Sequence, residues 1–252
     1  MRRRVPGRPA KSPPPRVRPA RRRTRRGDED RPPDALIFDV SRRLDERTPA
    51  WPGDVPFSWR TTASLAEGSQ WESSCFTMSA HLGTHADAIS HVIPGGASAG
   101  ALPLGPFLGP ARVVDLPGRG EVGPDALPRA CLGVARVLFR TGGRAFLAPL
   151  AAVRLAERGA ILVGTDAASI DPEDAEDLPV HRMLLGRGVY LLEGLDLSAT
   201  EPGDYRLIAL PMPLADLDAA PVRAVLIREP PPPEPGRRRA PKAKPAARSP
   251  RR

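Results

Sequence analysis

One eleven-residue stretch, HLGTHADAISH at residues 81–91, constrains this chain more than any other. The chain has only four histidines, and three of them lie here, with Asp87 between the last two. Imidazoles together with a carboxylate that can bridge two cations form a good ligand set for Zn2+ or Mn2+. The alternative is a set of loop histidines that bind no metal. The clustering of the three favours a metal site.

The residues that lead into this stretch favour a strand over a helix. A helix could place His81 and His85 on one face, but Gly83 between them weakens it. Residues 74–79 alternate apolar and polar side chains, which is typical of a β-strand. We therefore expect a strand that breaks near that glycine and then resumes, so that His85 and Asp87 lie on the same face.

The basic charge of the chain lies at its two ends. Residues 1–33 hold 13 Lys/Arg and 3 Asp/Glu, and residues 229–252 hold 8 and 2, so the formal net charge of +9 belongs to them. Residues 34–228 carry 17 basic and 24 acidic groups, which is a formal charge of −7. The two ends also hold 16 of the 33 prolines and few aliphatic residues. We expect both to be disordered tails that flank one domain at residues 34–228.

These basic tails have two interpretations. They could be arms that bind nucleic acid or another polyanion. They could instead be solvated tails, or at the amino end an extension from a misplaced start codon. We favour solvated tails because no aromatic residues interleave with the charges as a stacking surface would need. Any binding of nucleic acid through them is then expected to be non-specific.

The remaining composition predicts a cytoplasmic protein with no membrane partner. The two cysteines, Cys75 and Cys131, fit a reducing compartment and no disulfide framework. No apolar segment follows the arginine pairs near the start, as a secretory signal would require. No run of about 18 apolar residues exists, so no transmembrane helix is expected.

Hydropathy and turn residues predict a mixed α/β domain. Strands are expected at residues 36–40, 57–64, 74–79, 112–116, 136–140, 161–166, 189–192, 205–210 and 222–227. The clearest helix is expected at residues 149–158, with Pro149 at its first position and Gly159 just past its end. The Gly/Pro/Ala-rich segment 94–110 is expected to be a loop. Many short strands with one or two helices indicate a sheet bent into a barrel-like form.

A buried glutamate points to the same site from a distant part of the chain. Glu193 lies between leucines in a predicted strand, and such a carboxylate is costly to bury unless something cationic contacts it. An arginine partner is one explanation. A metal shared with Asp87 and with His181, the fourth histidine, is the other, and it accounts for both residues at once.

Several motifs together resemble one known family. The stretch at 81–91 is similar to the H-x-G-[TA]-H-x-D-x-P-x-H signature of the cyclase-type metal-dependent hydrolases. The motif Trp51-Pro52-Gly53-Asp54 resembles the substrate loop of the bacterial kynurenine formamidases within that family. The runs GTD at 164–166, SIDP at 169–172, LLEGL at 191–195 and PGDYRLIALPMPLADLDAAPVRAVL at 202–226 are also similar to that branch. The resemblance covers roughly residues 35–227 in the same order.

The resemblance implies a fold and a set of site residues. The fold is the swivelling β/β/α fold of the family, with a bent mixed sheet. One metal would be held by His81, His85 and Asp87, and a second by Asp87, His181 and Glu193, so that Asp87 bridges two divalent ions, Zn2+ or alternatively Mn2+.

The family's proton carrier and its substrate contact fall on two further residues. His91 matches the general acid/base, and Trp51 matches an aromatic that contacts the substrate. A plain packing role beside Pro52 is the alternative for Trp51. One departure is Ile89, where the family usually has proline, and it puts the orientation of His91 in doubt.

The activity that the resemblance implies is hydrolysis of N-formyl-L-kynurenine to L-kynurenine and formate, by a homodimer. Water activated between two metals would attack the formyl carbon, with His91 moving the proton to the departing arylamine. One alternative is another amide, lactam or lactone hydrolase of the family, such as an isatin hydrolase. An alternative from a different class is a polyanion-binding module with a structural metal site.

Overall fold

The structure of the protein is a computed structural model that describes residues 36–116 and 118–228. The strands are β1 Leu36–Asp39, β2 Ser58–Ala63, β3 Ser73–Thr77, β4 His85–Asp87, β5 Leu108–Asp115, β6 Gly120–Val122, β7 Arg136–Arg140, β8 Ala145–Leu147, β9 Leu162–Thr165, β10 Tyr190–Glu193, β11 Gly203–Ile208, β12 Ala219–Pro221 and β13 Val225–Arg228. The α-helices of the described part are α1 Pro149–Glu157 and α2 Pro179–Leu185. The predicted mixed α/β class is confirmed.

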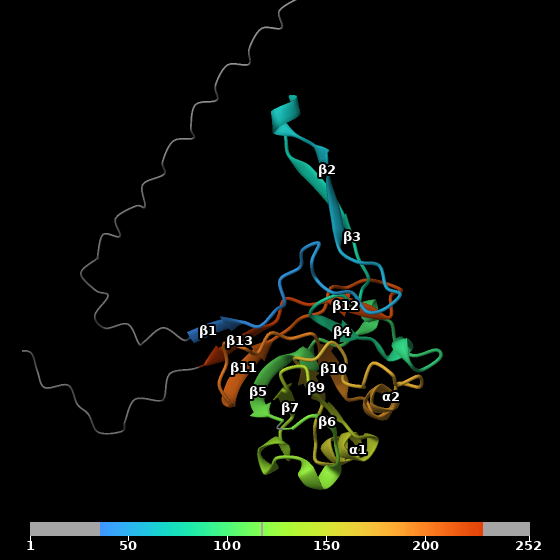
Figure 1. The fold of residues 1–252 in the computed structure, drawn as a ribbon, viewed down its shortest axis with the longest axis vertical. Coiled ribbons are helices and arrows are strands. Elements are labelled where there is room, and N and C mark those ends of the chain that lie inside the picture. Colours follow the sequence, from blue (N-terminus) through green and yellow to red (C-terminus); the bar gives the residue numbers. More distant parts are fainter. Residues whose placement is uncertain (1–35, 117, 229–252) are drawn as a thin grey trace, which may run out of the picture. The chain divides into compact units, whose positions relative to one another are not determined.

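In the described residues a curled, mixed sheet of nine strands organises the fold, in the order β1-β13-β11-β5-β7-β9-β10-β4-β12 (Figure 1). Its centre, from β5 to β10, is parallel, and antiparallel strands extend it on both sides. Strands β2 and β3 form a separate hairpin, and β6 pairs with β8. The sheet curls into a half-barrel, which confirms the predicted bent form.

The central strands bury both of their faces. Phe139 and Val163 belong to the core cluster that includes Leu155 of α1 and Val180 of α2. The residues that precede them, such as Leu138, belong to a second cluster on the opposite face. Because side chains alternate along a strand, a strand that is covered on both faces reads as one apolar run. Such apolar runs made the strands visible in the sequence.

Helix α1 has the ends that its sequence predicts. Pro149 occupies the first position, where the missing N–H is not needed, and Gly159 adopts φ +90° just past the end. Ala151, Ala152 and Leu155 are buried against the sheet. These three side chains belong to the same core cluster as Phe139 of β7 and Val163 of β9.

The loop expected at residues 94–110 is partly wrong, because β5 already begins at Leu108. In this first half, β5 pairs only with β11, while β7 begins its pairing at Arg112. The Arg136 guanidinium occupies the open side and donates to the carbonyl oxygens of Gly105, Pro106 and Pro110. Pro110 is therefore tolerated here, because no strand on this open side of β5 needs its missing N–H.

The carboxy-terminal strand and one strand pair also differ from the prediction. The strand expected at 222–227 corresponds to β13, which begins only at Val225, and the short strand β12 before it was not predicted. The short pair β6 and β8 was not predicted, because each strand has only three residues. The other predicted strands are present with ends shifted by at most a few residues.

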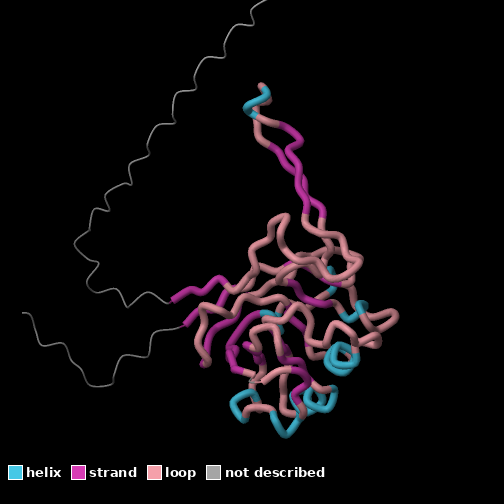
Figure 2. The backbone as a smooth tube through the Cα atoms, in the orientation of Figure 1, coloured by secondary structure: helices cyan, strands magenta, loops and turns pink. Residues whose placement is uncertain are grey.

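The β2–β3 hairpin extends away from the sheet (Figure 2). Trp59 and Phe76 are direct cross-strand partners, and both side chains are more than half exposed. Phe57 stacks on Phe76, with 6.1 Å between the ring centres. The hairpin thus presents a row of aromatic side chains that the described residues leave uncovered.

Two predictions about the whole chain lie beyond the described residues. The tails at 1–33 and 229–252 fall outside them, so the domain boundaries at 34 and 228 stay predictions. Among the described helices, none has the length and apolar character that crossing a membrane requires.

Candidate metal centre

Strands β4 and β10 bring three of the predicted ligands together. His85 and Asp87 occupy alternate positions of β4 and therefore project from the same face, as predicted. Glu193, the last residue of β10, is the direct cross-strand partner of His85. All three side chains are almost fully buried. The antiparallel register thus places the His85 imidazole beside both carboxylates.

A close approach of two glycines joins these strands where they carry the ligands. Gly194 adopts φ +62°, and a Cβ there would lie 2.0 Å from the carbonyl oxygen of Gly83. The Thr84 hydroxyl donates to the Gly194 carbonyl at 2.7 Å and accepts from the backbone N–H of Arg42 at 2.8 Å. Only glycine permits this contact, so residue 194 sets the spacing between His85 and Glu193.

Helix α2 carries His181 into the same centre. Its first N–H groups, on Val180 and His181, donate to the Asp171 carboxylate at 3.0–3.1 Å. The same carboxylate accepts from His181 Nδ1 at 2.7 Å. Asp171 is fully buried, so it both caps the helix and turns Nε2 of His181 toward Asp87 and Glu193.

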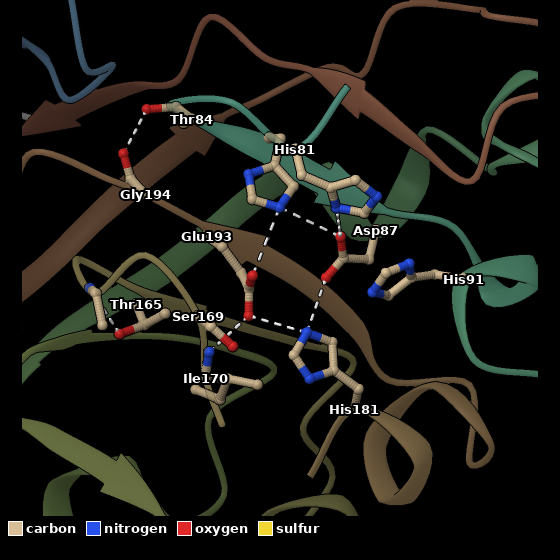
Figure 3. A network of polar contacts seen from close by, with 12 residues as sticks. His81, Thr84, Asp87, His91, Thr165, Ser169, Ile170, His181, Glu193 and Gly194 are labelled. Carbon is tan, nitrogen blue, oxygen red and sulfur yellow. Dashed lines mark hydrogen bonds and ion pairs between the residues drawn. The ribbon is translucent and has the colours of Figure 1, made fainter. Parts of the chain in front are cut away.

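The five predicted ligands lie around one point in the described structure, and Figure 3 labels four of them: His81, Asp87, His181 and Glu193. Asp87 Oδ1 lies 3.2 Å from His81 Nδ1 and 3.3 Å from His85 Nε2, and Asp87 Oδ2 lies 3.4 Å from His181 Nε2. Glu193 lies 3.2 Å from His181 Nε2 and 3.5 Å from His85 Nε2. The side chains of His81, His85, Asp87, His181 and Glu193 therefore converge, as the metal-site prediction requires.

These contacts are short, yet they leave polar atoms without hydrogen bonds. Among the described residues, the buried atoms His85 Nε2, Asp87 Oδ1 and Asp87 Oδ2 have no hydrogen-bond partner. Buried polar atoms are rarely left in this state, and the exceptions call for an ion or another group. The atoms belong to imidazole and carboxylate, which are ligands that Zn2+ and Mn2+ accept. The residues present thus fit a divalent metal ion.

The histidines also have the supporting hydrogen bonds of metal ligands. Besides the contact from His181 to Asp171, His85 Nδ1 lies 3.1 Å from the Gly83 carbonyl oxygen. His81 Nε2 lies 3.0 Å from the Asp218 carboxylate. In each ring the nitrogen that faces away from Asp87 thus has an acceptor. Metal-binding histidines are held in this way, because the second bond orients the ring.

The electrostatics of the centre follow from two buried carboxylates among three imidazoles. Burial alone disfavours charged His85, but Asp87 and Glu193 outweigh it and raise its pKa to about 10. Burial also acts against charged His181, yet Glu193, Asp171 and Asp87 raise its pKa well above the usual value. A metal ion needs the neutral imidazoles, so its binding would release protons from these rings.

His91 lies beside the predicted ligands on a short 3-10 turn, Ile89–His91. Its ring centre is 4.4 Å from that of His81 and 5.6 Å from that of His181. Ile89 opens the turn after an extended Ala88, with ψ 159°, which is the backbone that a proline would impose on its neighbour. The departure from the family proline therefore leaves His91 directed at the centre.

Ligand atoms in the described residues form two compact groups that divide the residues in a different way from the prediction. One group is His81, Asp87 and His91, and the other is His85, Asp87 and Glu193. Asp87 belongs to both groups, which is what a bridging carboxylate requires. Which side chains bind which ion therefore stays a prediction.

Trp51 lies at a cavity of about 890 Å³ that reaches the centre. His81 and Trp51 both line it, together with Arg42 and residues 166–168 and 194–198. Trp51 is half-buried, so part of its ring remains accessible to a ligand. His81 is the candidate ligand that lines this cavity, so the cavity reaches the centre on the side of His81.

The sequence reasoning missed two carboxylates that hold the histidines. Asp171 was noticed only as part of a motif, and its position ten residues before His181 carries no recognisable spacing. Asp218 lies in the run resembling the family's carboxy-terminal segment, and nothing local marks it. Asp54 accepts from the Ser79 hydroxyl and Ser169 from the Asp171 N–H. Asp166 accepts from the backbone N–H groups of residues 141 and 142.

Comparisons with known proteins point to one family. The Cyclase family model matches residues 38–172. A kynurenine formamidase of Geobacillus thermodenitrificans is 42% identical over 200 residues, which cover 75% of this chain and 96% of the relative. A kynurenine formamidase of Salinibacter ruber is also 42% identical, over 78% of this chain and 99% of the relative.

Solved structures share the fold. A predicted metal-dependent hydrolase from Bacillus stearothermophilus matches 78% of this chain and all of its own, with a TM-score of 0.69 and 28% identity. Isatin hydrolase A from Ralstonia solanacearum matches 77% of this chain and 92% of its own, with a TM-score of 0.66 and 22% identity. The latter likeness concerns the fold alone. From its sequence and its fold, the chain belongs to the cyclase family of metal-dependent hydrolases, among the kynurenine formamidases.

Proposed function

We propose that this protein hydrolyses N-formyl-L-kynurenine to L-kynurenine and formate with the help of two divalent metal ions, most simply Zn2+, with Mn2+ as the alternative. The observation that carries the proposal is the buried Asp87 carboxylate, whose two oxygens face three imidazoles and have no hydrogen-bond partner among the described residues. The kynurenine formamidases that match most of the chain support the choice of substrate.

Five side chains of this chain would hold the ions. They are His81, His85, Asp87, His181 and Glu193, with Asp87 shared. When bound, such ions lower the pKa of a water molecule and polarise an acyl oxygen. Asp171 and the Ile170 N–H, which donates to Glu193 at 2.6 Å, keep two of these ligands in place.

His91 would carry the proton during the reaction. Its ring lies against His81 and His181 but remains partly exposed, so it can reach both the centre and a bound substrate. It takes a proton from the attacking water and donates it to the arylamine nitrogen as the C–N bond breaks. The amine then leaves as a neutral group.

Trp51 would position the substrate's ring. It lines the same cavity as His81, and a flat indole face offers an aromatic ring a stacking surface. The formyl group attached to that ring would then point toward the ligand cluster. Trp51 therefore acts on binding and orientation rather than on the proton transfer.

The first prediction concerns activity and metal content together. The purified protein should release formate from N-formylkynurenine, lose this activity on chelation, and regain it with Zn2+ or Mn2+. Metal analysis should find two equivalents per chain. Isatin serves as the comparison substrate for the alternative hydrolase. Turnover of isatin without formate release, or formate release that resists chelation, would reject the proposed activity.

We further propose that the protein is a homodimer and that the β2–β3 hairpin takes part in its interface. A two-stranded hairpin by itself is marginally stable in water and needs a packing partner. Trp59, Phe76, Leu65 and Trp71 are each more than half exposed on it. A second copy would cover this face. The cytoplasmic location stays a prediction from the sequence.

The second prediction tests this interface. Replacing Trp59 and Phe76 together with serine should convert the protein from a dimer to a monomer in light scattering, because the pair forms the centre of the exposed face. Arg60→Ser lies on the opposite face of the hairpin and is the matched control. A wild-type monomer, or a double variant that remains dimeric, would contradict the proposed interface.

A further inference from the structure

Asp218 contacts two histidines of the centre with a single oxygen atom. Asp218 Oδ2 lies 3.0 Å from His81 Nε2 and 3.3 Å from His91 Nδ1. These are the contacts of its carboxylate within the described residues. One of the two rings is a proposed metal ligand, and the other is the proposed proton carrier.

The backbone holds Asp218 firmly at this place. Its carbonyl oxygen accepts from the Ala88 N–H at 2.9 Å, and the next residue, Ala219, pairs with Asp87 in the β4–β12 ladder. The strand that carries the bridging carboxylate thus also fixes Asp218. The position of the Asp218 backbone therefore keeps its carboxylate within reach of both rings.

Proton counting then determines the form of both rings. A neutral imidazole has one N–H donor and one acceptor nitrogen, and an ionised carboxylate only accepts. An aspartate side chain ordinarily loses its proton far below neutral pH, and Asp218 is about half exposed, so its carboxylate is the accepting partner. Both nitrogens that face Asp218 must therefore carry the hydrogen.

We propose that Asp218 is a positioning residue that holds His81 as the Nε2–H tautomer and His91 as the Nδ1–H tautomer. The free electron pair of His81 is then on Nδ1, 3.2 Å from Asp87 and available to a metal ion. The free pair of His91 is on Nε2, the nitrogen that would accept the proton. One carboxylate oxygen thereby prepares two rings for different tasks.

The size of the effect separates this role from simple stabilisation. The Asp218 side chain is about half exposed, and exposed ion pairs contribute little to the stability of a fold. Outer partners of metal-binding histidines, in contrast, change metal affinity or activity by about 10–100-fold. Loss of Asp218 should therefore leave the melting temperature nearly unchanged while it changes the tautomers of His81 and His91.

Nitrogen NMR of the histidines tests the tautomers directly. The chain has only four histidines, so 15N-histidine labelling of the zinc-loaded protein gives a spectrum that single variants can assign. We expect His91 as Nδ1–H in the wild type and a change toward Nε2–H, the more stable form of a free imidazole, in Asp218→Ala. Asp218→Asn should keep the wild-type pattern, because the amide oxygen still accepts.

Metal binding and kinetics provide the second readout. Asp218→Ala should bind zinc about 10–100-fold more weakly in a chelator competition and lower kcat by a similar factor, with little change in KM. Asp218→Asn should restore most of both, and Asp216→Ala, an exposed neighbour, should behave as the wild type. Wild-type His91 as Nε2–H, or an Asp218→Ala spectrum identical to that of the wild type, would overturn the proposal.

The kinetic part of this inference rests on the proposed function, and the spectral part does not. If the wild-type protein fails to hydrolyse N-formylkynurenine, the proposed function is rejected. The tautomers of His81 and His91 would still show whether Asp218 holds the two rings. The two failures can therefore be distinguished.

Discussion

Asp87→Asn is expected to lose at least one metal equivalent and to reduce the rate of formate release by more than about 10³-fold. This reduction is larger than the one caused by removing a single hydrogen-bond donor to a transition state. The side chain keeps its size, so packing around β4 is preserved. Its charge is lost, however, and a neutral amide bridges two cations poorly. Metal analysis of the purified variant and the initial rate at saturating zinc are the measurements.

The control for this variant is Asp125→Asn, because that carboxylate is fully exposed and its ion pair is with Arg154 on the surface. It should keep two metals and the full rate. If Asp87→Asn also retained its metals and its turnover, the shared carboxylate would not be the basis of the site. The arrangement of two ions would then be wrong.

His91→Ala is expected to keep both metals and to lower kcat by about 10²–10⁴-fold, the range typical of a missing general acid/base. The ring contacts two histidines and Asp218, but the proposed metal-binding set is complete without it. Stoichiometry by metal analysis and kcat with N-formylkynurenine measure the two properties separately.

His181→Ala provides the contrast, since that ring is buried between Asp87 and Glu193 and should lose metal as well as activity. The comparison matters because His91, His81 and Asp87 also lie close enough to hold one ion. A His91→Ala protein that lost metal in the same way would make His91 a ligand. The role of proton carrier would then need another residue.

Local sequence patterns were sufficient to predict how the strands of the metal centre place their side chains. The alternation of His85 and Asp87 after a glycine predicts two side chains on one face, and β4 has this geometry. An acidic residue between leucines predicts a charged partner for Glu193, and the structure places His85 and His181 there. Both inferences depend only on periodicity and on the cost of burying a charge.

Long-range contacts could not be found in this way. Helix α2 has seven residues and begins after Leu178, whose φ of +44° and side chain offer no cap. Its cap is Asp171, which is separated from the helix by a loop. Asp218 is 137 positions from His81 and 127 from His91. Local sequence propensities cannot predict such pairs, because the fold of the whole intervening chain determines whether the two residues meet.

Strand β4 lies in the sheet between β10 and β12, and this order affects how the protein is made. Both neighbouring strands are encoded more than a hundred codons after it. While the ribosome is still translating, residues 85–87 have no strand beside them, and loop closure over such a distance is slow. The five ligands can meet only after β10, which carries Glu193, has been made. A site with all five ligands therefore cannot form while β4 alone has left the ribosome.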